Sequence, residues 1–127
     1  KGVLSRQDAR KCREAGVRGM VVSHHNGRMN YAMPPLAVLP EIVKEVGDVM
    51  PIFVDCGVCS GMDAYKALAL GATAVSVGTH LIPFIRQGGA DGVAARMREM
   101  NDELRGTMAS TGVADTSSFD ASIIHRL

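Results

Sequence analysis

Residues Cys56 to His80 read CGVCSGMDAYKALALGATAVSVGTH. Residues Lys1 to His25 read KGVLSRQDARKCREAGVRGMVVSHH, and the two stretches match at an offset of 55 residues. The matched positions include an early Gly-Val pair, a Ser followed three residues later by Asp-Ala, a Gly before an apolar run, and a final His. An internal repeat reports a structural unit that the chain builds more than once, so it constrains the fold before any single motif does.

Both copies carry the features of a capped helix. The Ser-x-x-Asp patterns at residues 5–8 and 60–63 resemble capping boxes, with Asp in place of the usual Glu or Gln. The Ser oxygen can accept an N–H group that the first turn of a helix leaves unpaired. Segments rich in Ala, Leu, Lys and Arg follow, and each reaches a glycine, Gly16 or Gly71, where a helix end needs a positive φ. We therefore predict one helix in each copy.

Apolar runs after these glycines predict buried strands at residues 19–23 and 73–77. The segment between the copies predicts a helix at 39–46 and a strand at 51–55, and a long helix is expected at 91–108. Helices that alternate with strands predict an α/β fold with a parallel sheet, built as a single domain over residues 1–127.

The repeat favours a barrel over a doubly wound sheet. A period of 55 residues covers two βα units, which is typical of a (β/α)₈ barrel, although the chain holds only about half the strands of one. A Rossmann-like sheet is the competing interpretation, but no G-x-G-x-x-G opens the first helix. Barrels place function at the carboxyl ends of strands. Those ends are Lys1, if a strand precedes it, and residues 23–28, 55–60 and 78–80.

Composition narrows the class of partner. The 127 residues are 46% hydrophobic and 21% charged, with a net charge of +1, which gives no support for binding to nucleic acid or to a membrane surface. No apolar segment has the length of a transmembrane helix and no signal peptide is visible. Three cysteines, an odd number, favour a reducing, cytoplasmic setting. The start Lys1-Gly2 resembles the interior of a longer sequence, so we expect a fragment or a processed product.

VVSHHNGRM, at residues 21–29, resembles the SNHGGRQ stretch of the FMN-dependent 2-hydroxy-acid oxidases and dehydrogenases, such as lactate oxidase and glycolate oxidase. KGV, AGV, LPEIVKEVGD and GMDAYKALALGA follow the order and spacing of that family, and the likeness covers residues 1–111. The resemblance implies the C-terminal half of the family's TIM barrel, about strands five to eight. It also implies the FMN-dependent oxidation of a small 2-hydroxy acid to a 2-oxo acid.

The resemblance assigns roles to individual residues. His25 aligns with the catalytic base, and imidazole suits this role because its ordinary pKa lies near neutral pH. Arg28 aligns with the residue that binds the substrate carboxylate, which a planar guanidinium can grip bidentately. Lys1 aligns with the lysine beside the flavin ring. The implied cofactor contacts are Lys1, Ser23, Asp55, Gly57, Gly78 and Thr79.

Two departures from the family concern the FMN phosphate. Cys59 and Thr79 stand where the family has phosphate-binding arginines. The phosphate would then rely on backbone N–H groups near residues 79–81. Because two charge-assisted hydrogen bonds are lost, the sequence predicts FMN binding weakened by orders of magnitude.

Other interpretations of the same residues stay open. The chain is alternatively a degenerate, non-catalytic half-barrel that binds a phosphate ligand or a partner subunit. Cys56 and Cys59, with a histidine, are a third possibility as a metal site, although we expect the cysteines to be small buried fillers. We expect His24 to be structural or to tune the site. Half a sheet would leave two bare edges. We therefore expect the chain to pair with a missing N-terminal half or to form a homo-oligomer, and to have little turnover alone.

Overall fold

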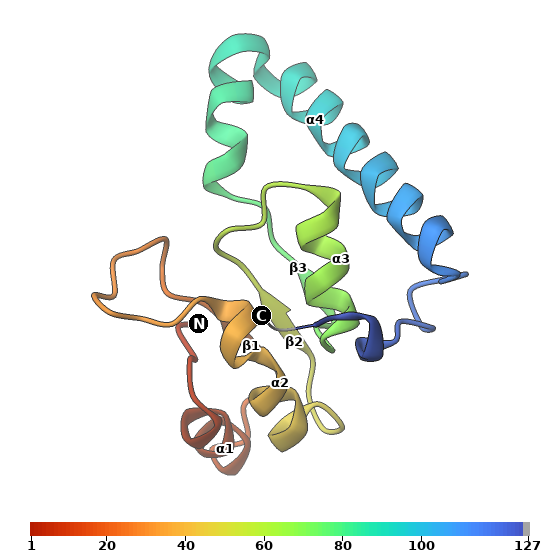
Figure 1. Ribbon diagram of the computed structural model, residues 1–127. Helices are drawn as coiled ribbons and strands as arrows, with labels where there is room; N and C mark the ends of the chain where they lie inside the picture. Colours follow the sequence, from red (N-terminus) through yellow and green to blue (C-terminus); the bar gives the residue numbers. More distant parts are fainter. Residues whose placement is uncertain (126–127) are drawn as a thin grey trace.

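A computed structural model describes residues 1–125 and shows an α/β fold around a short parallel sheet (Figure 1). Three strands in the order β1-β2-β3 form the sheet: β1 is Met20–Val22, β2 is Ile52–Val54 and β3 is Ala74–Val75. Each strand pairs in parallel with the one that follows it in the chain, and a bridge from Val3 to Val22 places the start of the chain beside β1. The order runs in one direction without reversal, as in a barrel sector.

Helices precede, connect and follow the strands. The helices are α1 (Arg6–Glu14), α2 (Pro35–Val46), α3 (Gly61–Ala69) and α4 (Ile82–Thr111), with short 3₁₀ turns η1 (Thr79–Leu81) and η2 (Ala121–Ile123). Within residues 1–125, none of them combines the length and the hydropathy that a membrane crossing requires.

The structure confirms the two capped helices of the repeat. α1 and α3 are both nine residues long, and the N-cap residues Ser5 and Ser60 each accept a hydrogen bond from the backbone N–H three residues on, at 3.1 Å. Gly16 and Gly71 follow the helices with φ values of 72° and 99°. A side chain is disfavoured in that left-handed region, which explains glycine at both positions.

The helices cover only one face of the sheet. Ile52 and Val54 of β2 are buried against a core that α1, α2 and α3 share with β1. Phe53, between them, points to the opposite face and keeps 39% of its surface exposed. Parallel sheets are ordinarily covered on both faces. We call the side that carries Phe53 the open face.

The bounds of several predicted elements differ from the observed ones. α2 begins at Pro35 rather than residue 39, because proline suits the first turn of a helix. α4 extends well beyond the predicted residues 91–108, since two helices join across a kink at Gly89 (φ 55°, ψ −139°). β3 is shorter than predicted, although Ser76 N–H still bonds to Val54 at 2.8 Å and continues the ladder.

Candidate active site

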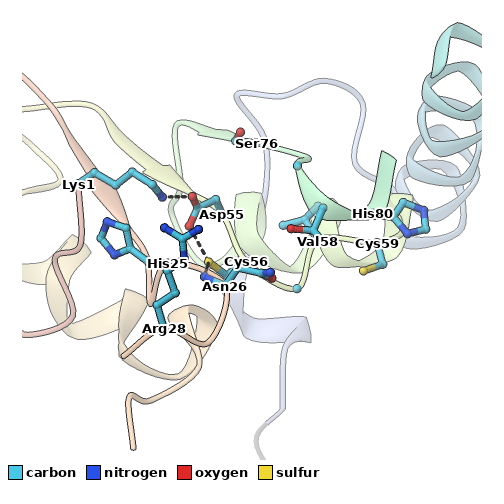
Figure 2. A pocket seen from close by; sticks show the side chains of 13 residues that line it. Lys1, His25, Asn26, Arg28, Asp55, Cys56, Val58, Cys59, Ser76 and His80 are labelled. Atoms are coloured by element: carbon cyan, nitrogen blue, oxygen red, sulfur yellow. Dashed lines mark hydrogen bonds and ion pairs between the residues drawn. The ribbon is translucent and has the colours of Figure 1, made fainter. Parts of the chain in front are cut away.

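A cavity of about 440 Å³ lies at the carboxyl ends of the strands (Figure 2). Its lining consists of Lys1, His25, Asn26, Arg28, Asp55, Cys56, Gly57, Val58, Cys59, Ser76, Gly78, Thr79 and His80. Seven of the eight residues that the sequence nominated for the site are among them, and Ser23 is the exception. The fold therefore gathers at one place residues that are up to 78 positions apart in the chain.

Lys1 links the ends of β1 and β2. Its ammonium donates a hydrogen bond to Ser23 Oγ at 2.7 Å and forms an ion pair with the Asp55 carboxylate. Ser23 is fully buried and also accepts the His25 N–H at 3.0 Å. Ser23 thus positions the residues that line the cavity instead of lining it itself.

Asp55 is held in its ionised form. Partial burial acts to raise the pKa of this carboxyl, but hydrogen bonds from Cys56, Lys1 and Ser23, with the charge of Lys1, outweigh that effect and lower the pKa below its ordinary value. The Asp55 carboxylate therefore stays ionised at neutral pH beside the Lys1 ammonium.

The loop after β1 carries His25 and Arg28. His25 and Asn26 both adopt positive φ, 54° and 57°, and the Asn26 N–H donates to Cys56 Sγ at 3.2 Å. His24 closes the turn by accepting the Gly27 N–H on Nδ1 at 2.9 Å, which confirms its expected structural role. The Arg28 side chain is exposed and reaches toward the end of the cavity where Asp55 lies (Figure 2).

The His25 ring packs against the backbone of Gly2. A Cβ atom built on Gly2 would lie 2.7 Å from His25 Cε1, closer than real Cβ contacts allow, and Gly2 has a φ of 97°. Glycine at this position therefore gives the imidazole its place beside Lys1. In the sequence, Gly2 stands out only because it matches Gly57 in the repeat.

The cysteines differ from what the sequence predicted. Cys59 is exposed, so the expectation that it is a buried filler is wrong. Cys56 is half-buried with a φ of 66°, and its Sγ donates to Asp55 Oδ1 at 3.0 Å. Within residues 1–125, no three His, Cys, Asp or Glu side chains are arranged to hold a metal ion.

Arg96 of α4 is a site neighbour that the sequence did not reveal. Its side chain, only 14% exposed, donates from Nη2 to the Cys59 carbonyl at 2.8 Å and from Nε to His80 Nε2 at 3.0 Å. Nη1 pairs with Glu99 and Glu103, each at 3.1 Å. No local sequence pattern marks a contact between residues 37 positions apart in the chain.

The side chains around the cavity suit acid–base chemistry on an anionic substrate. An imidazole can accept a proton near neutral pH, and a guanidinium can bind a carboxylate. A lysine ammonium fixed by a carboxylate offers a positive charge of defined position. His25 and Arg28 come from the loop after β1, and Lys1 comes from the start of the chain beside β1.

A protein-family model and several known proteins are similar to this chain. A family model described as FMN-dependent dehydrogenase matches residues 1–126. The peroxisomal (S)-2-hydroxyacid oxidase GLO3 of Arabidopsis thaliana is 43% identical over 113 residues, which are 88% of this chain and 31% of that protein. An L-lactate oxidase of Alicycliphilus denitrificans is 44% identical over 118 residues, 92% of this chain and 32% of that protein.

Solved structures are similar to this chain over nearly its whole length. A lactate oxidase of Pediococcus acidilactici superposes with a TM-score of 0.89 at 36% identity, covering 92% of this chain and 33% of the other. A mandelate oxidase variant with a monooxide FMN adduct superposes with a TM-score of 0.90 at 37% identity, covering 94% and 38%. The chain spans about a third of the length of these relatives.

Proposed function

We propose, because this chain belongs to the FMN-dependent dehydrogenase family, that it supplies the catalytic base, the carboxylate anchor and a flavin contact for the oxidation of a small 2-hydroxy acid to a 2-oxo acid. The observation that carries the proposal is that His25, Arg28 and Lys1 line one cavity at the carboxyl ends of the strands. Its relatives named as oxidases of 2-hydroxy acids and lactate support the substrate class.

We further propose that the chain is the C-terminal half of the barrel, about strands five to eight, and works with a missing N-terminal half. The one-directional order of parallel strands supports this, as does the open face that Phe53 leaves uncovered. Half of the strand ends of a complete pocket would then come from elsewhere. The chain alone is accordingly expected to turn over little. Its three cysteines, all free, are consistent with a cytoplasmic location.

The cavity fits a flavin at one end. Bound FMN would supply the acceptor for the two electrons that leave the substrate. Lys1, fixed by Ser23 and Asp55, places an ammonium where negative charge on a reduced ring would be stabilised. Gly57 and Gly78 keep the neighbouring backbone accessible, because their Cβ positions face open space. The opposite end of the cavity fits the phosphate poorly, since Cys59 and Thr79 carry no charge.

In this proposal the substrate is bound by Arg28 and its proton is accepted by His25. Arg28 binds the substrate carboxylate and so fixes the orientation of the hydroxyl-bearing carbon. A ring nitrogen of His25 accepts the proton that the substrate loses. Ser23 holds the His25 backbone at 3.0 Å and Gly2 sets the position of its ring.

The first test is a visible absorption spectrum of the longest native form of the protein, before and after anaerobic addition of lactate or glycolate. We expect a flavin spectrum that bleaches. His25→Ala should slow the bleaching by about 10²–10⁴-fold while the bound flavin remains, because only the proton acceptor is removed. Arg28→Lys should instead raise the substrate concentration at which bleaching reaches half its maximal rate, because a bidentate contact with the substrate carboxylate becomes a single one. A bound flavin that no 2-hydroxy acid reduces would contradict the proposal.

A second candidate is the non-catalytic half-barrel that binds a ligand or a partner subunit. The observation that favours it is the uncharged far end of the cavity, where Cys59 and Thr79 lie. The same spectrum distinguishes the two, because this candidate requires that substrate produce no bleaching.

A further inference from the structure

The charges of the cavity lie at one end. Lys1, Arg28 and Asp55 are its charged lining residues within the described chain. Figure 2 shows them together with His25, whereas Cys59 and His80 lie at the opposite end. If the flavin ring lies beside Lys1 and His25, as proposed above, the ribityl chain and its terminus extend toward the opposite end. We call that end the distal end and define it by Cys59, Thr79 and His80.

Backbone donors at the start of α3, beside the distal end, are already occupied. The Cys59 N–H donates to the Asp63 carboxylate at 3.0 Å, and the Gly61 N–H donates to the Glu103 carboxylate at 2.6 Å. The Asp63 N–H donates to Ser60 Oγ at 3.1 Å. Free N–H groups at the start of a helix are what usually attracts a phosphate. At the start of α3, the chain's own oxygens occupy these donors.

Arg96, the guanidinium beside the distal end, is also engaged. It donates to the Cys59 carbonyl and to His80, and it pairs with both Glu99 and Glu103. The hydrogen bond from Gly61, followed by that from Arg96, lowers the pKa of Glu103, so this carboxylate is ionised at neutral pH. Two carboxylates against one guanidinium leave the network with a net negative charge. A phosphate dianion next to it would be repelled rather than bound.

We infer that this cavity does not select the flavin phosphate and binds riboflavin, the flavin without that group, at least as tightly as FMN. The inference rests on the proposed function insofar as that function places a flavin in the cavity. A phosphate at the distal end would lose its hydration without gaining an unpaired cation, and for hydrogen bonds it would depend on the N–H groups at the start of η1. A neutral hydroxyl terminus would lose less and would not be repelled.

The test is a titration of the longest native form of the protein with riboflavin and with FMN, followed by quenching of flavin fluorescence. The expected result is a Kd for FMN no lower than that for riboflavin. The double variant Cys59→Arg with Thr79→Arg should shift the ratio of the two Kd values at least tenfold toward FMN. Ala109→Arg with Ser110→Arg adds the same charge at exposed positions near the end of α4 and should leave the ratio unchanged. Thermal melting of each variant establishes that it is folded.

The outcomes separate this inference from the proposed function. Tighter binding of FMN than of riboflavin by the unaltered protein would overturn the inference and leave the oxidation intact. Equal or tighter binding of riboflavin, with no bleaching by any 2-hydroxy acid, would overturn the oxidation and leave the inference standing. If the folded protein binds neither flavin, both are wrong.

Discussion

The position of the His25 ring depends on Gly2, a residue that has no side chain. Because a Cβ on Gly2 would meet His25 Cε1 at 2.7 Å, the ring can lie beside Lys1 only while position 2 stays glycine. The resemblance to a family nominated His25 from the sequence, and the cavity indeed contains it. The contact with Gly2 was not predictable, because it joins residues on neighbouring strands and depends on two positive φ values.

Gly2→Ala should displace the His25 imidazole and slow substrate-dependent flavin bleaching by at least tenfold, with the flavin still bound. The matched control is Gly16→Ala. Gly16 also has a positive φ, 72°, but its Cβ position meets nothing within 4 Å, and it lies at the end of α1, away from the cavity. Both variants carry backbone strain, so equal rates in the two would contradict the steric role given to Gly2.

Among the helices, local chemistry predicted α1 and α3 well and α4 poorly. Ser and Gly mark both ends of α1 and α3, and those signals act within one turn of the chain. The reach of Arg96 to Cys59 depends instead on how α4 packs against α3. Such contacts between distant segments leave no periodic trace in a sequence, so the contact of Arg96 with the distal end could not be predicted.

Gly61 lets α4 cross the start of α3 at close range. A Cβ there would lie 2.3 Å from the Met100 carbonyl oxygen and 2.4 Å from the Leu104 nitrogen, both backbone atoms that cannot easily move. Gly61→Ala should therefore lower the free energy of unfolding by about 1–3 kcal/mol. Gly106→Ala, within α4 and facing open space, should raise it by about 0.5–1 kcal/mol. Urea denaturation measures both, and a neutral Gly61→Ala would contradict the close crossing.

Glu45 joins α2 to α1 and makes this contact sensitive to pH. The hydrogen bond from Arg10, with the charges of Arg10, Arg6 and Arg13, lowers the pKa of Glu45 to about 2 against the opposing effect of burial. Since the folded pKa lies below the ordinary value of 4.5, the stabilisation is complete above that value and is lost as pH falls toward about 2.

Glu45→Gln should lower the urea midpoint at pH 7 and flatten the loss of stability between about pH 5 and pH 2. Glu41→Gln is the control, because Glu41 lies exposed on the same helix and forms no ion pair within residues 1–125. Urea denaturation at several pH values gives the comparison. Parallel pH profiles for Glu45→Gln and the unaltered chain would contradict the assignment.

The open face of the sheet is the feature of the fold that bears most on a partner of this chain. The strand order supports the barrel sector that the repeat predicted, and the family match gives the same fold. Which partner covers Phe53 could not be predicted, because alternation along β2 fixes only which side chains face away from the helices.

Phe53→Lys should keep the 127-residue chain monomeric, whereas the unaltered chain should self-associate or bind the proposed N-terminal half through the open face. Val49→Lys is the control: Val49 is more exposed, at 57%, but lies in the turn after α2 and not on the sheet. Sedimentation of the three proteins at equal concentration measures the effect. A monomeric unaltered chain that also fails to bind the N-terminal half would contradict the proposed pairing.

The loop between β1 and α2 has a consequence for proteolysis. It holds Arg28, exposed, and Tyr31, whose side chain is fully exposed, between two well-packed elements. Exposed loop tips are where proteases cut first, so trypsin should nick this loop before it reaches the helices. A cut after Arg28 would break the chain between β1 and α2 while leaving the core intact. A carboxylate ligand bound to Arg28 would delay that cut, and the protein's sensitivity to trypsin would then report occupancy of the site without any turnover.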